Sequence, residues 1–119
     1  NLDSMRTIAD VRDAVRAYWL LLTSSPEPGS YYNIGGNKSL KVGDILKDLI
    51  SLSTKKNIEF KVDKDRLRPI DADLQIPNIQ KFVKKTGWEP IINYEKTLED
   101  LLNYWRERIE KEGNTFLER

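Results

Sequence analysis

The first strong pattern along the chain is a helical repeat of apolar residues over residues 10–23. Asp10 stands directly before this repeat, where its carboxylate can cap the first turn of a helix. The repeat ends at two prolines and a glycine within residues 26–29, which together stop a helix and open a turn. The apolar positions of this predicted helix are Val11, Ala14, Val15, Tyr18, Trp19 and Leu22.

Three more helices are predicted, over residues 40–54, 78–86 and 95–111. Ser39 is placed to cap the first of them, and Gly87 to end the second. In the first, the residues expected to face the core are Val42, Ile45, Leu46, Leu49 and Ile50. In the last, the apolar stripe consists of Leu98, Leu101, Leu102, Trp105 and Ile109.

Two short segments have the character of strands. Residues 31–34 are aromatic and β-branched, and residues 58–62 alternate apolar with charged side chains. Strands separated by amphipathic helices indicate an α/β or mixed α+β fold built from helices and a few short strands. Because so few strands leave sheet edges open, we expect residues 31–34 to pair with another strand of the chain or with another copy.

Composition indicates a single domain. The chain has 119 residues, of which 39% are hydrophobic, and its 20 basic side chains nearly cancel its 19 acidic ones. A net charge of +1 gives no reason to expect nucleic acid or a membrane surface as a partner. The sequence shows no apolar run of membrane-spanning length and no signal peptide, so it predicts a soluble, cytoplasmic protein.

Cysteine and histidine are both absent. Their absence from the sequence excludes disulfides, thiolate nucleophiles, imidazole bases and the usual zinc ligands. The remaining catalytic groups are carboxylates, Lys, Tyr and hydroxyls, each of which needs a positioned partner or a cofactor to react near neutral pH.

Three residues are candidates for binding an anionic ligand. Arg6 lies in a short extended segment before the first helix, while Arg68 precedes a proline and has Asp71 three residues later. A guanidinium fork can grip phosphate oxygens while a nearby carboxylate accepts hydrogen bonds from hydroxyls, an arrangement that suits a sugar nucleotide. Two plainer interpretations stay open: Arg6 as a surface residue paired with a carboxylate, and an ion pair between Arg68 and Asp71.

Other conspicuous residues have structural interpretations. The turn at Gly35 and Gly36 could cradle a phosphate, but a glycine pair equally marks a change of direction between a strand and a helix. Trp88 lies between a helix-ending glycine and a proline turn and is assigned to core packing, as are Trp19 and Trp105 on their helical stripes.

Several motifs occur in a consistent order over residues 1 to about 109. They are RTIADVRD at 6–13, YNIG at 32–35, RPID at 68–71, TGWEP at 86–90 and LLNYWR at 101–106. Their order resembles the C-terminal part of the extended short-chain dehydrogenase/reductase family, the nucleotide-sugar epimerases and dehydratases. Within that family, NLDS at residues 1–4 and the RPID form look most similar to the GDP-mannose 4,6-dehydratases, with the GDP-4-keto-6-deoxymannose reductases close behind.

This resemblance implies substrate-binding roles for the three candidates. Arg6 matches a family arginine that contacts the nucleotide diphosphate, and Arg68 matches a second one on the opposite side. Asp71 matches the acidic residue that holds the nucleotide ribose. The implied reaction converts GDP-mannose to GDP-4-keto-6-deoxymannose with NADP, which oxidises C4 before water is eliminated across C5 and C6 and the hydride returns at C6. No residue of the chain is assigned a catalytic, cofactor-binding or metal-binding role.

The sequence lacks the family's cofactor and acid/base motifs. None of its six glycines has the spacing of a dinucleotide-binding turn, and no Tyr is followed by Lys four residues later. We therefore expect residues 1–119 to be a C-terminal substrate-binding part of a Rossmann-type enzyme, inactive alone. Its partners would be the N-terminal dinucleotide-binding domain of the same enzyme, the nucleotide-sugar substrate, and further copies in a homo-oligomer. Alternatives are a reductase, an epimerase for another nucleotide sugar, and a non-catalytic interaction module.

Overall fold

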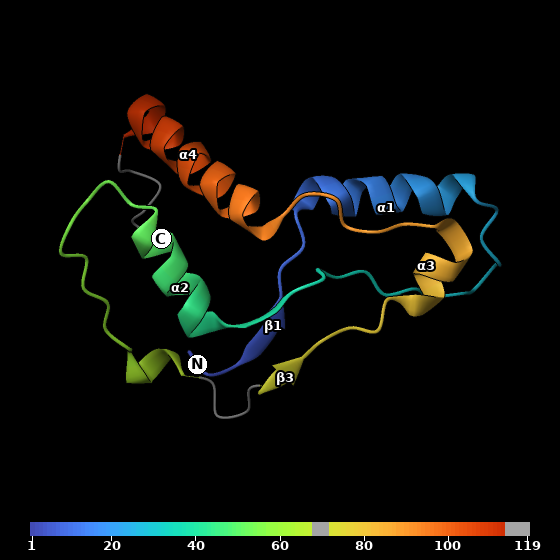
Figure 1. Cartoon of the computed structure of the whole chain (residues 1–119), viewed down its shortest axis with the longest axis horizontal. Coiled ribbons are helices and arrows are strands. Elements are labelled where there is room, and N and C mark those ends of the chain that lie inside the picture. Colours follow the sequence, from blue (N-terminus) through green and yellow to red (C-terminus); the bar gives the residue numbers. More distant parts are fainter. Residues whose placement is uncertain (68–71, 114–119) are drawn as a thin grey trace.

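The described residues of the chain form four helices and three short strands (Figure 1). The computed structural model describes residues 1–67 and 72–113. In chain order the elements are β1 (Met5–Thr7), α1 (Val11–Thr23), β2 (Ser39–Lys41), α2 (Val42–Ser51), a 3-10 turn (Lys64–Arg66), β3 (Leu74–Gln75), α3 (Gln80–Thr86) and α4 (Tyr94–Glu112). The mixed α/β class is therefore confirmed, and all four helices occur where the sequence predicted them.

The strands form one small sheet in the order β2-β1-β3. Strand β1 is antiparallel to β2, with Arg6 opposite Leu40, and parallel to β3, with Arg6 opposite Gln75. Three segments far apart in the sequence thus meet at β1. Figure 1 shows this sheet below two helical groups, with α1 and α3 on one side and α2 and α4 on the other.

Local signals set several helix ends. The Asp10 carboxylate accepts a hydrogen bond from the Arg12 backbone N–H at 2.9 Å, and Asn93 caps α4 in the same way through Lys96. Gly87 ends α3 in the left-handed conformation with φ of 69°, which a glycine adopts without steric cost. The expected roles of Asp10 and Gly87 are confirmed.

The strand predictions were wrong. Among the described residues, strands occur in neither 31–34 nor 58–62, and Ser39 lies in β2 rather than at a helix cap. Helix α2 begins instead after Lys41, which makes no side-chain cap bond. A strand needs a hydrogen-bonding neighbour, and the described chain supplies one to β1, β2 and β3 but not to the two predicted segments.

The core lies between α1, α3 and the segment that follows α3. Ala17, Phe82 and Trp88 are buried there, and the half-buried residues packed against them are Leu20, Leu21, Tyr32, Ile34 and Ile79. The ring centroids of Phe82 and Trp88 are 5.6 Å apart. The packing role predicted for Trp88 is confirmed.

Helix α1 presents its most apolar face to solvent. Its side chains Val11, Val15, Tyr18, Trp19 and Leu22, which we call the α1 stripe, are 62–74% exposed. The core role predicted for Trp19 is therefore wrong within this chain, and Trp105 is also more than one third exposed. The radius of gyration is 17.4 Å, against roughly 13.5 Å for a compact domain of this length. The fold is thus open, with apolar surface left uncovered.

No helix within residues 1–67 and 72–113 has the length and apolar character needed to cross a bilayer. The same residues contain no cluster of acidic side chains suited to holding a metal ion.

Candidate functional site

Arg6 sits at the centre of the sheet, on the strand that joins its other two. Its Nη1 atom donates hydrogen bonds to the backbone carbonyls of Met5 at 2.9 Å and Ala72 at 2.7 Å. Next to it, the backbone N–H of Met5 donates to the Asp73 carbonyl at 2.7 Å. The guanidinium is therefore held against the segment that leads into β3, 66 residues further along the chain.

An open hollow of about 590 Å³ lies beside Arg6. We call it the Arg6 hollow; its lining residues are Arg6, Thr7, Asn33, Ile34, Leu74, Gln75, Ile76 and Pro77. A cation, a hydroxyl and two amide side chains line it, groups suited to binding a polar, anionic ligand. Thr7 and Asn33 lie in motifs recognisable in the sequence, although they were not chosen as site residues. Gln75 carried no such signal, because only the pairing of β1 with β3 brings it here.

Arg68 and Asp71, the other two predicted site residues, lie outside the described residues. Ala72, whose carbonyl accepts the hydrogen bond from Arg6, directly follows Asp71 in the sequence. The structure therefore brings Arg6 to the end of the segment that carries both residues. Convergence of the three side chains stays a prediction.

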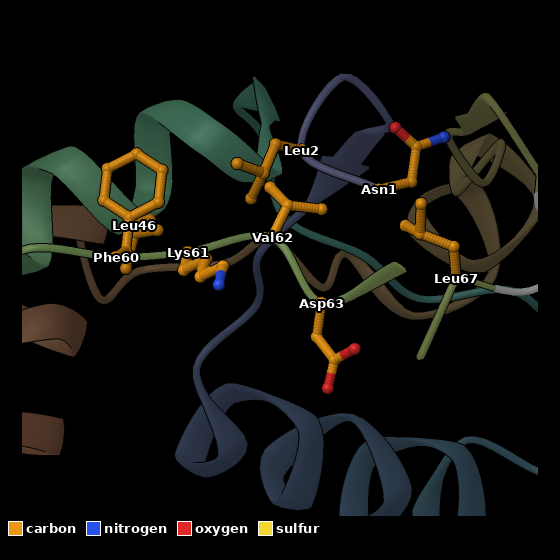
Figure 2. A pocket seen from close by; sticks show the side chains of 8 residues that line it. All are labelled: Asn1, Leu2, Leu46, Phe60, Lys61, Val62, Asp63 and Leu67. Carbon is orange, nitrogen blue, oxygen red and sulfur yellow. The ribbon is translucent and has the colours of Figure 1, made fainter. Parts of the chain in front are cut away.

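A second hollow of about 420 Å³ lies between α2, the N-terminal residues and the segment before residue 68. Figure 2 shows the side chains of Leu2 and Val62 meeting at its centre, Phe60 beside Leu46 at one end, and the carboxylate of Asp63 directed away from them. Asn1, Lys61 and Leu67 complete the lining. Its lining is more apolar than polar, and its lysine is accompanied by the acidic Asp63, so it suits a phosphate less well than the Arg6 hollow does.

The glycine pair does not form a phosphate cradle. A Cβ atom built on Gly36 would lie 1.8 Å from the backbone oxygen of Ile8, and one on Gly35 would lie 2.6 Å from the ring of Pro77. The chain's own backbone thus fills the space next to Gly36. These glycines are required for the close approach of two segments.

A network of ion pairs joins α1 to α4 away from the Arg6 hollow. Arg12 bonds both to its neighbour Asp10 and to Asp100 of α4, each at 2.8 Å. Hydrogen bonds from Arg12, supported by one from Thr97, lower the pKa of Asp10 well below its usual range. This network connects two helices beside a largely apolar hollow between them, and we assign it to structure.

Two further titratable groups are held by hydrogen bonds. Burial alone would raise the pKa of Asp13, but hydrogen bonds from Arg16 and from the backbone N–H groups of Ile92 and Ile91 outweigh it and lower that pKa. Burial, together with a hydrogen bond to Asp48 at 2.9 Å, raises the pKa of Tyr94. A tyrosine with a raised pKa stays protonated near neutral pH, where it cannot act as a general base.

Comparison with known proteins gives a consistent result. The sequence model of the family described as GDP-mannose 4,6 dehydratase matches residues 1–101. The dTDP-D-glucose 4,6-dehydratase of Mus musculus is 31% identical to the chain over 101 residues, which are 82% of this chain and 28% of that protein.

Solved structures show the same similarity. The RMD protein of Pseudomonas aeruginosa, complexed with NADPH, superposes with a TM-score of 0.74 at 26% identity over 91% of this chain. The dTDP-glucose 4,6-dehydratase of Bacillus anthracis, in complex with NAD, superposes with a TM-score of 0.75 at 25% identity over 92% of it. The match covers 35% and 34% of those two proteins, so the chain spans about a third of their length.

Proposed function

Because the chain belongs to the GDP-mannose 4,6-dehydratase family of nucleotide-sugar enzymes, we propose that it is the substrate-binding part of such an enzyme. In this proposal the substrate is GDP-mannose, the product is GDP-4-keto-6-deoxymannose, and NADP is held by a dinucleotide-binding domain outside these residues. The observation that carries the proposal is the position of Arg6. Its guanidinium borders a polar hollow and donates a hydrogen bond to the carbonyl of Ala72, the residue that follows Asp71 in the sequence.

The role of Arg6 follows from how it is held. Two backbone carbonyls fix the orientation of its guanidinium, so little side-chain entropy remains to be lost when an anion binds. A diphosphate distributes its charge over several oxygens, and two guanidinium forks from different segments neutralise it better than one. We assign Arg6 and Arg68 to the diphosphate, and Asp71 to a ribose hydroxyl that donates a hydrogen bond to its carboxylate.

We infer that the residues which the structure describes do not hold a dinucleotide. Gly35 and Gly36 form the turn that most resembles a phosphate-binding turn, and the backbone of Ile8 fills the space next to Gly36. Hydride transfer therefore belongs to the dinucleotide-binding domain, and the contribution of these residues is to bind and orient the nucleotide sugar. We expect the 119-residue chain by itself to turn over neither GDP-mannose nor its relatives.

The test is a binding measurement on the full-length enzyme that carries residues 1–119. Arg6→Ala should weaken GDP-mannose binding, measured by isothermal titration calorimetry, by roughly ten- to a hundredfold, since a charge-assisted bond contributes about 1.5–3 kcal/mol. Arg68→Ala should have an effect of similar size. Asp71→Ala should reduce the affinity for GDP-mannose by less, because the hydroxyl that it is proposed to bind is neutral. Lys38→Ala removes a cation paired with Glu95 outside the hollow and is the matched control. Unchanged affinity in Arg6→Ala would refute the assignment.

A second candidate substrate is dTDP-glucose, which the 31% identity with the mouse dTDP-D-glucose 4,6-dehydratase favours. Both substrates carry a diphosphate, so Arg6 would serve either one. Titrating the same enzyme with GDP-mannose and with dTDP-glucose distinguishes them, since the correct base leaves fewer buried polar groups unpaired.

A further inference from the structure

Strand β1, which carries Arg6, is too short to be rigid on its own. It has three residues, and its parallel partner β3 has two. A sheet of this size needs packing against helices to be stable. The position of the Arg6 guanidinium therefore depends on what holds the two ends of β1.

The N-terminal end of β1 is fastened to helix α2. The backbone N–H of Val42 donates a hydrogen bond to the Ser4 carbonyl at 3.0 Å. The backbone N–H of Gly43 donates one to the Leu2 carbonyl at 2.8 Å. These are the first two N–H groups of α2, whose N-cap Lys41 makes no side-chain bond. The residues at the start of β1 thus satisfy the end of α2, and the two elements are held together.

The C-terminal end of β1 leads directly into helix α1. Only two residues separate Thr7, the last residue of β1, from Asp10, the N-cap of α1. One of them, Ile8, is also pressed against Gly36, where an added Cβ would lie 1.8 Å from the Ile8 backbone oxygen. So short a linker has little slack, so that a shift of Asp10 is passed on to β1.

Helix α4 is bonded to α2. The hydroxyl of Tyr94, which is buried at the start of α4, donates a hydrogen bond to the Asp48 carboxylate at 2.9 Å. Further along α4, the Arg106 guanidinium donates to the backbone carbonyl of Leu52 at 3.2 Å. The two helices are thus connected at two points.

Helix α4 is also bonded to the N-terminus of α1. The Thr97 hydroxyl donates a hydrogen bond to the Asp10 carboxylate at 2.9 Å. The Asp100 carboxylate accepts one from Arg12 at 2.8 Å. Because an open and largely apolar hollow of about 420 Å³ lies beside these bonds, polar contacts provide much of the connection between the two helices here.

The four elements form a closed ring, in which β1 leads into α1, α1 is bonded to α4, α4 to α2, and α2 to the start of β1 (Figure 1). We propose that α4 fixes both ends of β1, so that Tyr94, Thr97 and Asp100 are positioning residues for Arg6. We call these three residues the α4 brace. They lie outside the lining of the Arg6 hollow and act on Arg6 through β1. The inference rests on the proposed function, because it concerns the orientation of the group assigned to the diphosphate.

The test is a double-mutant cycle on the full-length enzyme that carries residues 1–119. Asp100→Ala removes the partner of Arg12 and should weaken GDP-mannose binding, measured by isothermal titration calorimetry, by about two- to fivefold. In an Arg6→Ala background the same substitution should have no further effect, because a residue that acts through another is not additive with it. Glu99→Ala is the matched control: Glu99 pairs with Lys96 within α4, and its loss should leave the affinity unchanged.

A measurement without ligand tests the brace by itself. Hydrogen exchange followed by NMR on the 119-residue chain reports on the backbone N–H of Met5, which bonds to the Asp73 carbonyl. This N–H should exchange several times faster in Asp100→Ala and in Tyr94→Phe, since β1 is then held less firmly. The backbone N–H of Phe82, in the core between α1 and α3, should keep its rate in both variants.

Three outcomes would overturn the brace. They are full affinity in Asp100→Ala although Arg6→Ala binds weakly, an equal loss of affinity with and without Arg6, and faster exchange at Met5 and Phe82 alike, since α4 would then stabilise the whole fold. If Arg6→Ala itself keeps full affinity, the proposed function fails. The exchange rate at Met5 then decides by itself whether α4 fixes β1.

Discussion

The indole Nε1 of Trp88 donates a hydrogen bond to the backbone carbonyl of Asp13 at 3.1 Å, joining segments 75 residues apart. Both side chains are almost completely buried. The Asp13 carboxylate in turn accepts hydrogen bonds from the backbone N–H groups of Ile91 and Ile92 at 3.0 and 2.9 Å. These two residues fasten helix α1 to the segment that connects α3 to α4.

Replacing Trp88 should therefore be among the most destabilising changes in the chain. Trp88→Ala leaves a cavity next to Phe82 and should lower the free energy of unfolding by about 3–5 kcal/mol, measured by urea denaturation followed by circular dichroism. Trp105→Ala, in a more exposed position on α4, is the control and should cost much less. Similar losses in the two variants would show that Trp88 does not organise the core.

Removing the Asp13 carboxylate should also destabilise the fold. Asp13→Ala leaves two part-buried backbone N–H groups without their acceptor and removes the carboxylate partner of Arg16, and should lower the free energy of unfolding by about 2–4 kcal/mol. In Asp44→Ala, which breaks an exposed ion pair with Lys47 on α2, the cost should stay below about 1 kcal/mol. Thermal denaturation of the two variants side by side checks this, and a larger loss for Asp44→Ala would contradict it.

A methyl group at Gly36 should be poorly tolerated. The added Cβ would lie 1.8 Å from the Ile8 backbone oxygen, so the two segments would have to separate. We expect Gly36→Ala to destabilise the chain by more than about 2 kcal/mol. Gly29→Ala is the comparison, because a Cβ at that position would meet open space. Only the positive φ of 78° should matter there, lowering the free energy of unfolding by about 1 kcal/mol. Equal stability of the two variants would count against the close approach at Gly36.

Stability should depend on acid through Asp10. Its pKa is lowered in the folded state by hydrogen bonds from Arg12, so its contribution is complete above its unfolded pKa of about 3.9 and is lost as the pH falls through the folded value. The stability difference between the wild type and Asp10→Asn should therefore narrow below about pH 4. Urea denaturation at a series of pH values measures this gap. A gap that stays constant on acidification would mean that Asp10 does not contribute as a carboxylate.

The helices were predictable because their signals are local. Asp10 and Gly87 fix helix ends through bonds to residues only a few positions away, and these bonds form as the sequence indicated. Which face of a helix is buried is not a local property. The α1 stripe has the spacing of a core face, but the core meets the side of α1 that carries Asp13 and Ala17.

The strands could not be located in the same way. Residues 58–62 have the alternation of a strand and form none, whereas β1 and β3 are short, contain polar residues and are made by pairing across nearly 70 residues. The candidate site likewise combines a residue that its local sequence reveals with one that only long-range pairing brings in. Arg6 was recognisable from its motif, but Gln75 joins the Arg6 hollow only through that long-range pairing.

The order of the strands in the sheet also has a consequence for synthesis. Strand β1 emerges first from the ribosome, yet the carbonyl that orients Arg6 belongs to Ala72, and the parallel partner β3 begins at Leu74. Closing so long a loop is slow compared with forming a helix. Helix α1 can therefore form early during translation, whereas the guanidinium of Arg6 is held in place only after Ala72 has been made.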